Sequence, residues 1–148
     1  MSFPDLEISE KTKQSLNVLN TVRAYNRRLI LEALKRKSIT SVSVVYDGYG
    51  DSGGITDFEV NGGKGEADLT DKVVSQVVEP LAATVFDEEL TLKDLIESLA
   101  MELVESDHGG WENNEGGSGT VTFDTQAMQV RVEHVENYLS HEEYTHIY

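Results

Sequence analysis

The stretch ITSVSVVYDGYGDSGGITDFEV, residues 39–60, decides the fold class of this 148-residue chain. It holds two runs rich in β-branched and aromatic residues, 39–46 and 55–60, separated by a cluster of Gly, Asp and Ser. Such a pattern predicts a β-hairpin with a long, glycine-rich loop. Working outward from this hairpin, we expect one helix before it and a second helix and hairpin after it.

Residues 9–37 are expected to form a basic N-terminal helix. Their apolar side chains recur at helical spacing, and Lys35, Arg36 and Lys37 stand at the negative end of the helix dipole. The arginines of this helix could grip phosphate or simply form a solvated face, and the pattern leaves both interpretations open.

After the first hairpin, residues 61–90 read as a variable segment. A loop at 61–68 precedes KVVSQVVEPL, where Pro80 interrupts either a strand or a short helix. For 69–90 we expect a short strand followed by irregular chain.

The second half repeats the order of helix and hairpin. Leucines at helical spacing predict a helix over 91–108, which Thr91 and Asp94 begin with the spacing of a capping box. Residues 118–135 predict a second hairpin, and the tail at 136–148 is polar and aromatic, with no form assigned.

Together these elements predict a single α+β domain covering 1–148. We expect a two-layer fold, in which two β-hairpins form an antiparallel sheet of about four strands and two helices pack on one face. A chain of this length can bury one hydrophobic core and does not need disulfides or a bound metal to be stable. It contains no cysteine, which excludes disulfides and thiolate metal sites.

The charge of the chain is strongly negative and uneven. Its net charge is −15, and residues 1–37 carry +4 while the rest carries −19. Such acidity either keeps a protein dissolved or serves recognition of a basic protein partner or a cation. Direct nucleic-acid binding is expected only through the basic helix at 9–37. Neither a signal peptide nor a long apolar run is present, so we expect a cytoplasmic protein without a membrane contact.

Several short motifs resemble catalytic or metal sites without completing them. GDSGG surrounds Ser52 as in trypsin-like proteases, but every histidine of the chain follows Ser52, and Ile55 stands where those proteases have proline. His141 and His146 are five residues apart, not the four that a helical zinc motif requires. Asp47 and Asp51 do not alternate as in an EF-hand. The stretch at 48–54 therefore reads as a turn.

The strongest constellation is DHGGWENNEGGSG, residues 107–119. Its imidazole could act as an acid or base, its carboxylates could hold a divalent cation, and its indole could stack on a ring. Trp111 could equally plug the core while the two asparagines turn the chain. The candidate binding residues from the two glycine-rich stretches are Asp47, Asp51, Ser52, His108, Trp111, Glu112, Asn113, Asn114 and Glu115.

The paired motifs YDGYGDSGGI and HGGWENNEGGSG resemble a family of uncharacterised proteins from bacteria, plasmids and phages, catalogued as a domain of unknown function. The resemblance covers about 40–60 and 91–148. It implies a small α+β protein of mobile elements, with no assigned activity. The motif positions that it singles out are Asp47, Gly50, Asp51, Ser52, Gly53, His108, Gly110, Trp111, Glu112, Asn113, Asn114, Glu115 and Gly119.

Two functions from different classes follow. The first is an acidic, non-enzymatic binding protein of a phage or mobile element, without a cofactor, which acts on a host or partner protein as an inhibitor or nucleic-acid mimic. The second is a metal-dependent hydrolase or nucleotide-binding protein that uses 47–52 and 108–115 as the walls of one cleft. A homo-oligomer remains open in either case.

Overall fold

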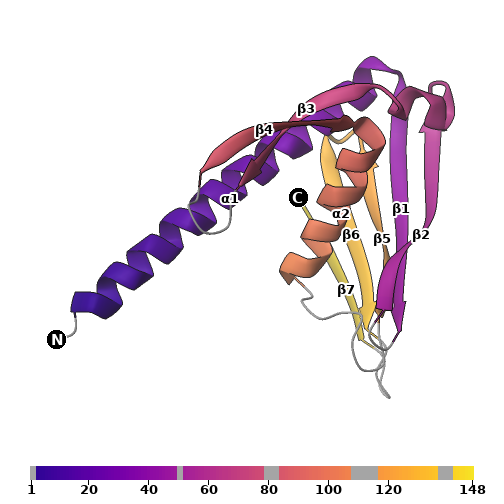
Figure 1. Cartoon of the computed structure of the whole chain (residues 1–148). Coiled ribbons are helices and arrows are strands. Elements are labelled where there is room, and N and C mark those ends of the chain that lie inside the picture. Colours follow the sequence, from indigo (N-terminus) through magenta and orange to yellow (C-terminus); the bar gives the residue numbers. More distant parts are fainter. Residues whose placement is uncertain (1–2, 50–51, 79–83, 108–116, 137–141) are drawn as a thin grey trace.

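The computed structural model describes residues 3–49, 52–78, 84–107, 117–136 and 142–148, which form an α+β fold (Figure 1). The α+β class expected from the sequence is confirmed. In chain order the elements are α1 (Phe3–Arg36), β1 (Ile39–Tyr49), β2 (Ser52–Gly62), the short 3-10 helix η1 (Gly65–Leu69), β3 (Lys72–Val78), β4 (Val85–Thr91), α2 (Leu92–Asp107), β5 (Gly117–Asp124), β6 (Gln129–Glu136) and β7 (Glu142–Ile147).

The larger sheet has five strands in the order β2-β1-β5-β6-β7, and all neighbours are antiparallel. The two hairpins, β1–β2 and β5–β6, join through β1 and β5, where Gly48 lies opposite Gly117. The expected count of about four strands is wrong, because the aromatic tail adds β7 beside β6. Val130 and Tyr148 continue that pairing by exchanging two backbone hydrogen bonds, at 2.7 and 2.9 Å.

The glycine-rich stretch of the first hairpin is largely strand. β1 continues to Tyr49 and β2 begins at Ser52, with Asp47 opposite Gly54. The long loop expected between the two runs is therefore wrong. β1 pairs with β2 on one side and with β5 on the other, and these two ladders offset the weak strand propensity of glycine.

Residues 69–90 contain a second antiparallel pair, β3 and β4, instead of one strand and irregular chain. Asn26 of α1 holds β3 by two hydrogen bonds. Its side-chain nitrogen donates to the Gln76 carbonyl oxygen at 2.9 Å, and its side-chain oxygen accepts from the Gln76 amide at 3.0 Å. Because this pair lies along α1 (Figure 1), the two layers expected from the sequence do not describe the whole arrangement.

The core joins both helices to one face of the five-stranded sheet. Alternate residues of β1, β5 and β6 are buried with apolar side chains of α1 and α2, while the residues between them lie on the opposite face. We call that opposite side the open face. The buried apolar residues of this sheet are Ile39, Val42, Val44, Tyr46, Val121, Phe123, Val130 and Val132.

Both expected helices are present. α1 begins at Phe3, earlier than the expected residue 9, and ends at Arg36. α2 corresponds to the helix expected over 91–108, and its predicted cap is present. The Thr91 hydroxyl accepts a hydrogen bond from the Asp94 amide at 3.1 Å.

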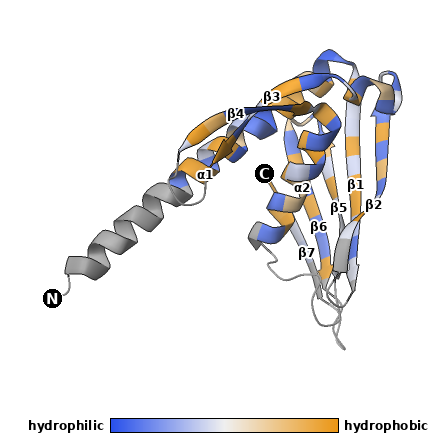
Figure 2. Cartoon of the chain, in the orientation of Figure 1, coloured by the Kyte–Doolittle hydropathy of each residue, from blue (hydrophilic) through white to orange (hydrophobic). Residues whose placement is uncertain are grey.

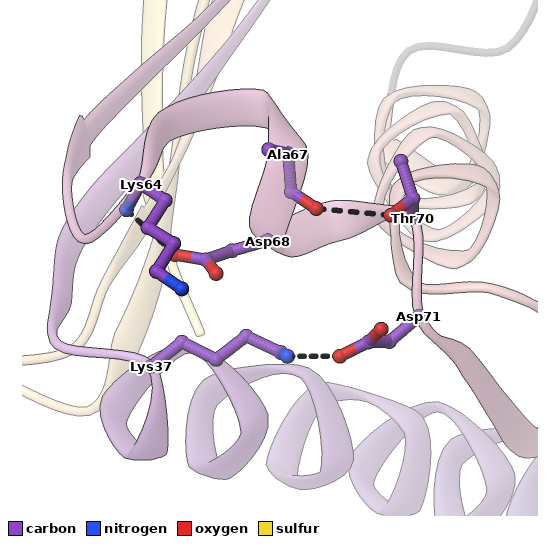
Figure 3. A network of polar contacts seen from close by, with 6 residues as sticks. All are labelled: Lys37, Lys64, Ala67, Asp68, Thr70 and Asp71. Atoms are coloured by element: carbon purple, nitrogen blue, oxygen red, sulfur yellow. Dashed lines mark hydrogen bonds and ion pairs between the residues drawn. The ribbon is translucent and has the colours of Figure 1, made fainter.

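A compact polar network sets the path from β2 to β3 (Figure 3). In η1 the Asp68 carboxylate accepts from the Lys64 amide at 2.7 Å, and the Thr70 hydroxyl donates to the carbonyl of the residue three before it at 2.9 Å. Lys37, just past α1, forms an ion pair with Asp71, and this pairing lowers the pKa of the Asp71 carboxyl. The network ties the end of α1 to the start of β3.

Within the described part of the chain, no helix combines the length and apolar character needed to cross a membrane.

Candidate functional site

Of the candidate binding residues, Asp47 and Ser52 lie in described strands. Asp47 is exposed on the open face of β1, opposite Ser118 of β5 and Gly54 of β2. The backbone of Ser52 begins β2 opposite Tyr49. Neither residue lies in the loop that the sequence suggested.

The other seven candidates lie outside the described residues. Their proposed contact with Asp47 therefore stays a prediction. These candidates are Asp51, His108, Trp111, Glu112, Asn113, Asn114 and Glu115.

The described strands nevertheless bring both motifs to one end of the sheet. Gly48 lies opposite Gly53 in β2 and opposite Gly117 in β5, and Gly117 lies opposite Glu136 in β6. The end of β1, where the first motif lies, is thus side by side with the start of β5, which directly follows 108–116. This register is the only placement of the second motif that the described strands provide.

A buried polar pair lies one step inside this end of the sheet. Tyr46 of β1 and His134 of β6 are 0% and 1% exposed. The Tyr46 hydroxyl and His134 Nδ1 are hydrogen-bonded at 2.5 Å, and the ring centroids are 5.7 Å apart in a stacked arrangement. Burial raises the pKa of the Tyr46 hydroxyl, which therefore stays protonated at neutral pH.

Two glycines of the second motif make room for this pair. Gly119 of β5 lies between Tyr46 and His134 in the sheet. A Cβ at Gly119 would lie 2.5 Å from the Tyr46 hydroxyl oxygen, and one at Gly117 would lie 2.9 Å from His134 Cε1. Gly117 and Gly119 of GGSG are thus explained by two aromatic rings that approach the β5 backbone.

Sequence reasoning missed this pair. The alternation in VRVEHV places His134 in the same phase as Val130 and Val132, and that phase faces the core. Tyr46 likewise continues the phase of Val44. Reading these two alternations together would have predicted a buried tyrosine and a buried histidine.

The open face of the sheet is polar and acidic. Hydroxyl side chains of β1 and β5, together with Val45, form its middle, and in Figure 2 pale segments alternate with orange ones along these strands. The only cation among its described residues, Arg131, lies 3.9 Å from a Glu133 carboxylate oxygen. Among the residues whose side chains are described, the carboxylates of this face are those of Asp47, Asp57, Glu59, Asp124 and Glu133.

The described residues supply no ready metal centre. Nowhere in the described ranges do three or more His, Asp or Glu side chains gather so that they could hold a metal ion. A divalent cation near Asp47 would need ligands from the residues outside those ranges.

The chain belongs to a family of unknown function, DUF6878, whose model matches residues 22–148. The match takes in 61–90 and α1 from Val22 onward, both beyond the resemblance seen in the motifs. A search of the curated proteins and a search of the solved structures each returned no match. The family membership therefore brings no activity to this chain.

Proposed function

We propose that this protein is a non-enzymatic binding protein, and that a partner protein with a basic surface lies on the open face of the five-stranded sheet. The observation that carries the proposal is the arrangement of five carboxylates around hydroxyl side chains on a face that neither helix covers.

The charge of the chain supports this function. Carboxylates on one face sum to a negative potential, which speeds the encounter with a positive surface and excludes negative ones. Asp57 and Glu59 stand on the edge strand β2 and are exposed, so they are free to approach a partner's lysines and arginines. A protein that normally binds nucleic acid has a surface rich in lysine and arginine. Our protein would inhibit such a partner by occupying the residues that bind phosphate.

The side chains in the middle of the open face also support a protein partner. Apart from Val45, the described side chains at the centre of β1 and β5 are small hydroxyls, which can donate and accept hydrogen bonds across an interface. The hydroxyls are those of Ser41, Ser43, Ser118, Thr120 and Thr122.

A pull-down with charge-reversal variants tests this proposal. The tagged protein should retain a specific basic protein from a lysate of the cells that encode it at low salt, and release it at high salt. Asp57→Lys with Glu59→Lys should abolish retention. Asp87→Lys with Glu89→Lys makes the same change of charge on β4 and should retain the partner.

Two outcomes would refute the function. The first is the absence of any specific partner at low salt, and the second is full retention by the Asp57/Glu59 variant. Equal loss in both variants would show that net charge alone, and no particular face, governs the retention.

A second candidate function is a metal-dependent hydrolase or nucleotide-binding protein that uses 47–52 and 108–115. The pairing of Gly48 with Gly117 favours it, because these two glycines belong to the two motifs and lie side by side at one end of the sheet. A thermal-shift screen against divalent ions and nucleotides distinguishes the two functions. A ligand at 100 times its Kd adds about 2.7 kcal/mol to the free energy of unfolding. A screen without any shift rejects this second function.

A further inference from the structure

A groove of about 560 Å³ lies where α1, α2 and the β3–β4 pair meet, on the other side of the molecule's core from the open face. Each helix presents residues at helical spacing along it. Those of α1 are Leu19, Val22, Arg23 and Asn26, and those of α2 are Leu95, Ser98, Met101, Glu102 and Glu105.

The wall formed by β3 is firmly held. Asn26 is 5% exposed, and both of its hydrogen bonds go to the Gln76 backbone, so the strand is fixed at the groove rather than lying loosely over it. Ser75 of the same strand is buried and donates to the Glu88 carbonyl oxygen of β4 at 3.1 Å. The groove is therefore a feature of the folded chain that exists before any partner binds.

The apolar lining continues onto an exposed surface. Val77 and Val78 line the groove and lie opposite Phe86 and Val85 of β4. The exposed fractions of Phe86 and Val85 are 50% and 45%, and both strands contain orange segments in Figure 2. Val77 and Phe86 share one face of this strand pair, and Val78 and Val85 share the other, because consecutive strand residues point to opposite faces. Exposed apolar side chains next to a groove are typical of a surface that binds another protein.

Carboxylates surround this apolar surface. Glu88, Glu102 and Glu105 line the groove, against one cation, Arg23. Burial raises the pKa of the Glu102 carboxyl, and the Arg23 charge acts against that rise. Since part of its hydration is already lost, the Glu102 carboxylate gains from a second positive charge brought by a ligand.

We propose that this groove binds an amphipathic helix of a partner protein, with the apolar side of that helix on the groove and its lysines or arginines against Glu88, Glu102 and Glu105. The occupant is a helix because the groove is bordered by two helical stripes, against which a third helix packs by ridges into grooves. The charge of the rim requires a basic helix. This inference does not depend on the open face.

A synthetic peptide tests the proposal directly. The probe is a fluorescein-labelled peptide of leucine and lysine, with the leucines at helical period, and its binding to the full chain is followed by fluorescence anisotropy. A peptide of the same composition in scrambled order is the control for nonspecific charge attraction. We expect saturable binding of the ordered peptide and at least tenfold weaker binding of the scrambled one.

Matched variants locate the binding. Glu102→Gln with Glu105→Gln, and separately Val85→Ser with Phe86→Ser, should each weaken the ordered peptide about tenfold. Asp57→Asn with Glu59→Gln removes the same charge from the open face and should change the Kd less than twofold. The Gln variants should fold, because burial already disfavours the Glu102 charge, and thermal unfolding checks this.

Three results would overturn the proposal. They are no binding of the ordered peptide, equal weakening by the groove and open-face variants, and a homodimer that Val85→Ser with Phe86→Ser dissociates without peptide. The last would show that a second copy covers the groove. The pull-down with the Asp57/Glu59 variant tests the open face, and the peptide experiment tests the groove. Either proposal can therefore fail without the other.

Discussion

Gly119 carries no side chain because two neighbours occupy the space that one would need. A Cβ there would lie 2.2 Å from the Glu133 carbonyl oxygen, which is backbone and has little freedom to move, and 2.5 Å from the Tyr46 hydroxyl. At Gly54 of β2, by contrast, a Cβ would meet nothing within 4 Å. The two glycines belong to the same sheet but differ in what surrounds them.

We therefore expect Gly119→Ala to lower the free energy of unfolding by about 2–4 kcal/mol, in the upper range for an overpacked site. Gly54→Ala should change it by less than about 0.5 kcal/mol. Urea unfolding of both variants measures the difference. Equal stabilities would mean that the close approach of β5, Tyr46 and Glu133 is absent in solution.

The Tyr46–His134 pair predicts a dependence on alkaline pH. Burial holds the pKa of Tyr46 above its usual 10.0, whereas the unfolded tyrosine ionises near that value. The stability that Tyr46 contributes is thus complete below pH 10 and is lost above it, at up to about 1.4 kcal/mol per pH unit. At neutral pH, Tyr46→Phe should cost about 1–3 kcal/mol, because His134 Nδ1 loses a buried hydrogen bond.

The test compares urea unfolding of the wild type and Tyr46→Phe from pH 8 to pH 11. The difference between them should shrink above pH 10, because only the wild type carries this hydroxyl. A difference that stays constant over that range contradicts the buried, protonated state of Tyr46.

At the scale of elements, the side chain of Asn26 ties the backbone of β3 to α1. Asn26 supplies both a donor and an acceptor to Gln76. Asn26→Ala leaves both backbone groups of Gln76 without these partners, at about 1–3 kcal/mol for a buried group. We expect the Gln76 amide to exchange at least tenfold faster with solvent hydrogen.

Hydrogen exchange followed by NMR measures this opening. Asn20→Ala changes an exposed asparagine of the same helix and is the control. Faster exchange throughout the five-stranded sheet, rather than in β3 alone, would show that Asn26 supports the whole core and not the hairpin.

The start of α2 provides a further prediction at this scale. Thr91→Ala removes the hydroxyl that accepts from the Asp94 amide and should cost about 1 kcal/mol, whereas Thr91→Ser keeps the oxygen and should cost less. Thermal unfolding of both variants checks the order. Equal losses would indicate that the threonine methyl group, and not the cap, stabilises the helix.

Elements whose structure follows from a local sequence pattern were predicted well. Elements that form only by pairing with distant strands were not. α2 shows its leucine period and its cap in the sequence, and β6 shows its alternation. The end of β1 and the start of β2 are rich in glycine and become strand only because of the ladders beside them. β7 is the edge strand beside β6, and no local pattern in HEEYTHIY predicts a strand at the edge of the sheet.

The candidate site was predicted less well, for a similar reason. Chemistry-bearing residue types were found in the sequence, but a carboxylate's surroundings depend on which strands become neighbours. Asp47 belongs to an acidic face because β2 and β6 add Asp57 and Glu133 to it, from distant positions in the sequence. The groove is lined by residues of four elements, and the sequence of any one of these elements does not predict it.

At the scale of the whole molecule, the net charge of −15 sets the response to salt. Repulsion among carboxylates destabilises the compact state more than the expanded one, and added salt screens it. The free energy of unfolding should therefore rise from low to physiological ionic strength. Urea unfolding at several sodium chloride concentrations measures this rise, and a fall would mean that attractive ion pairs outweigh the repulsion.

The junction of β1 with β5 governs the order in which the chain can fold. Residue 48 meets residue 117, so at least 117 of the 148 residues, about four-fifths of the chain, must be synthesised before the junction can close. Until then the emerging β1–β2 hairpin has a valine-rich strand whose second edge is open, and such edges recruit other chains. Newly made protein should thus be most prone to aggregate at the ribosome, before its second half emerges.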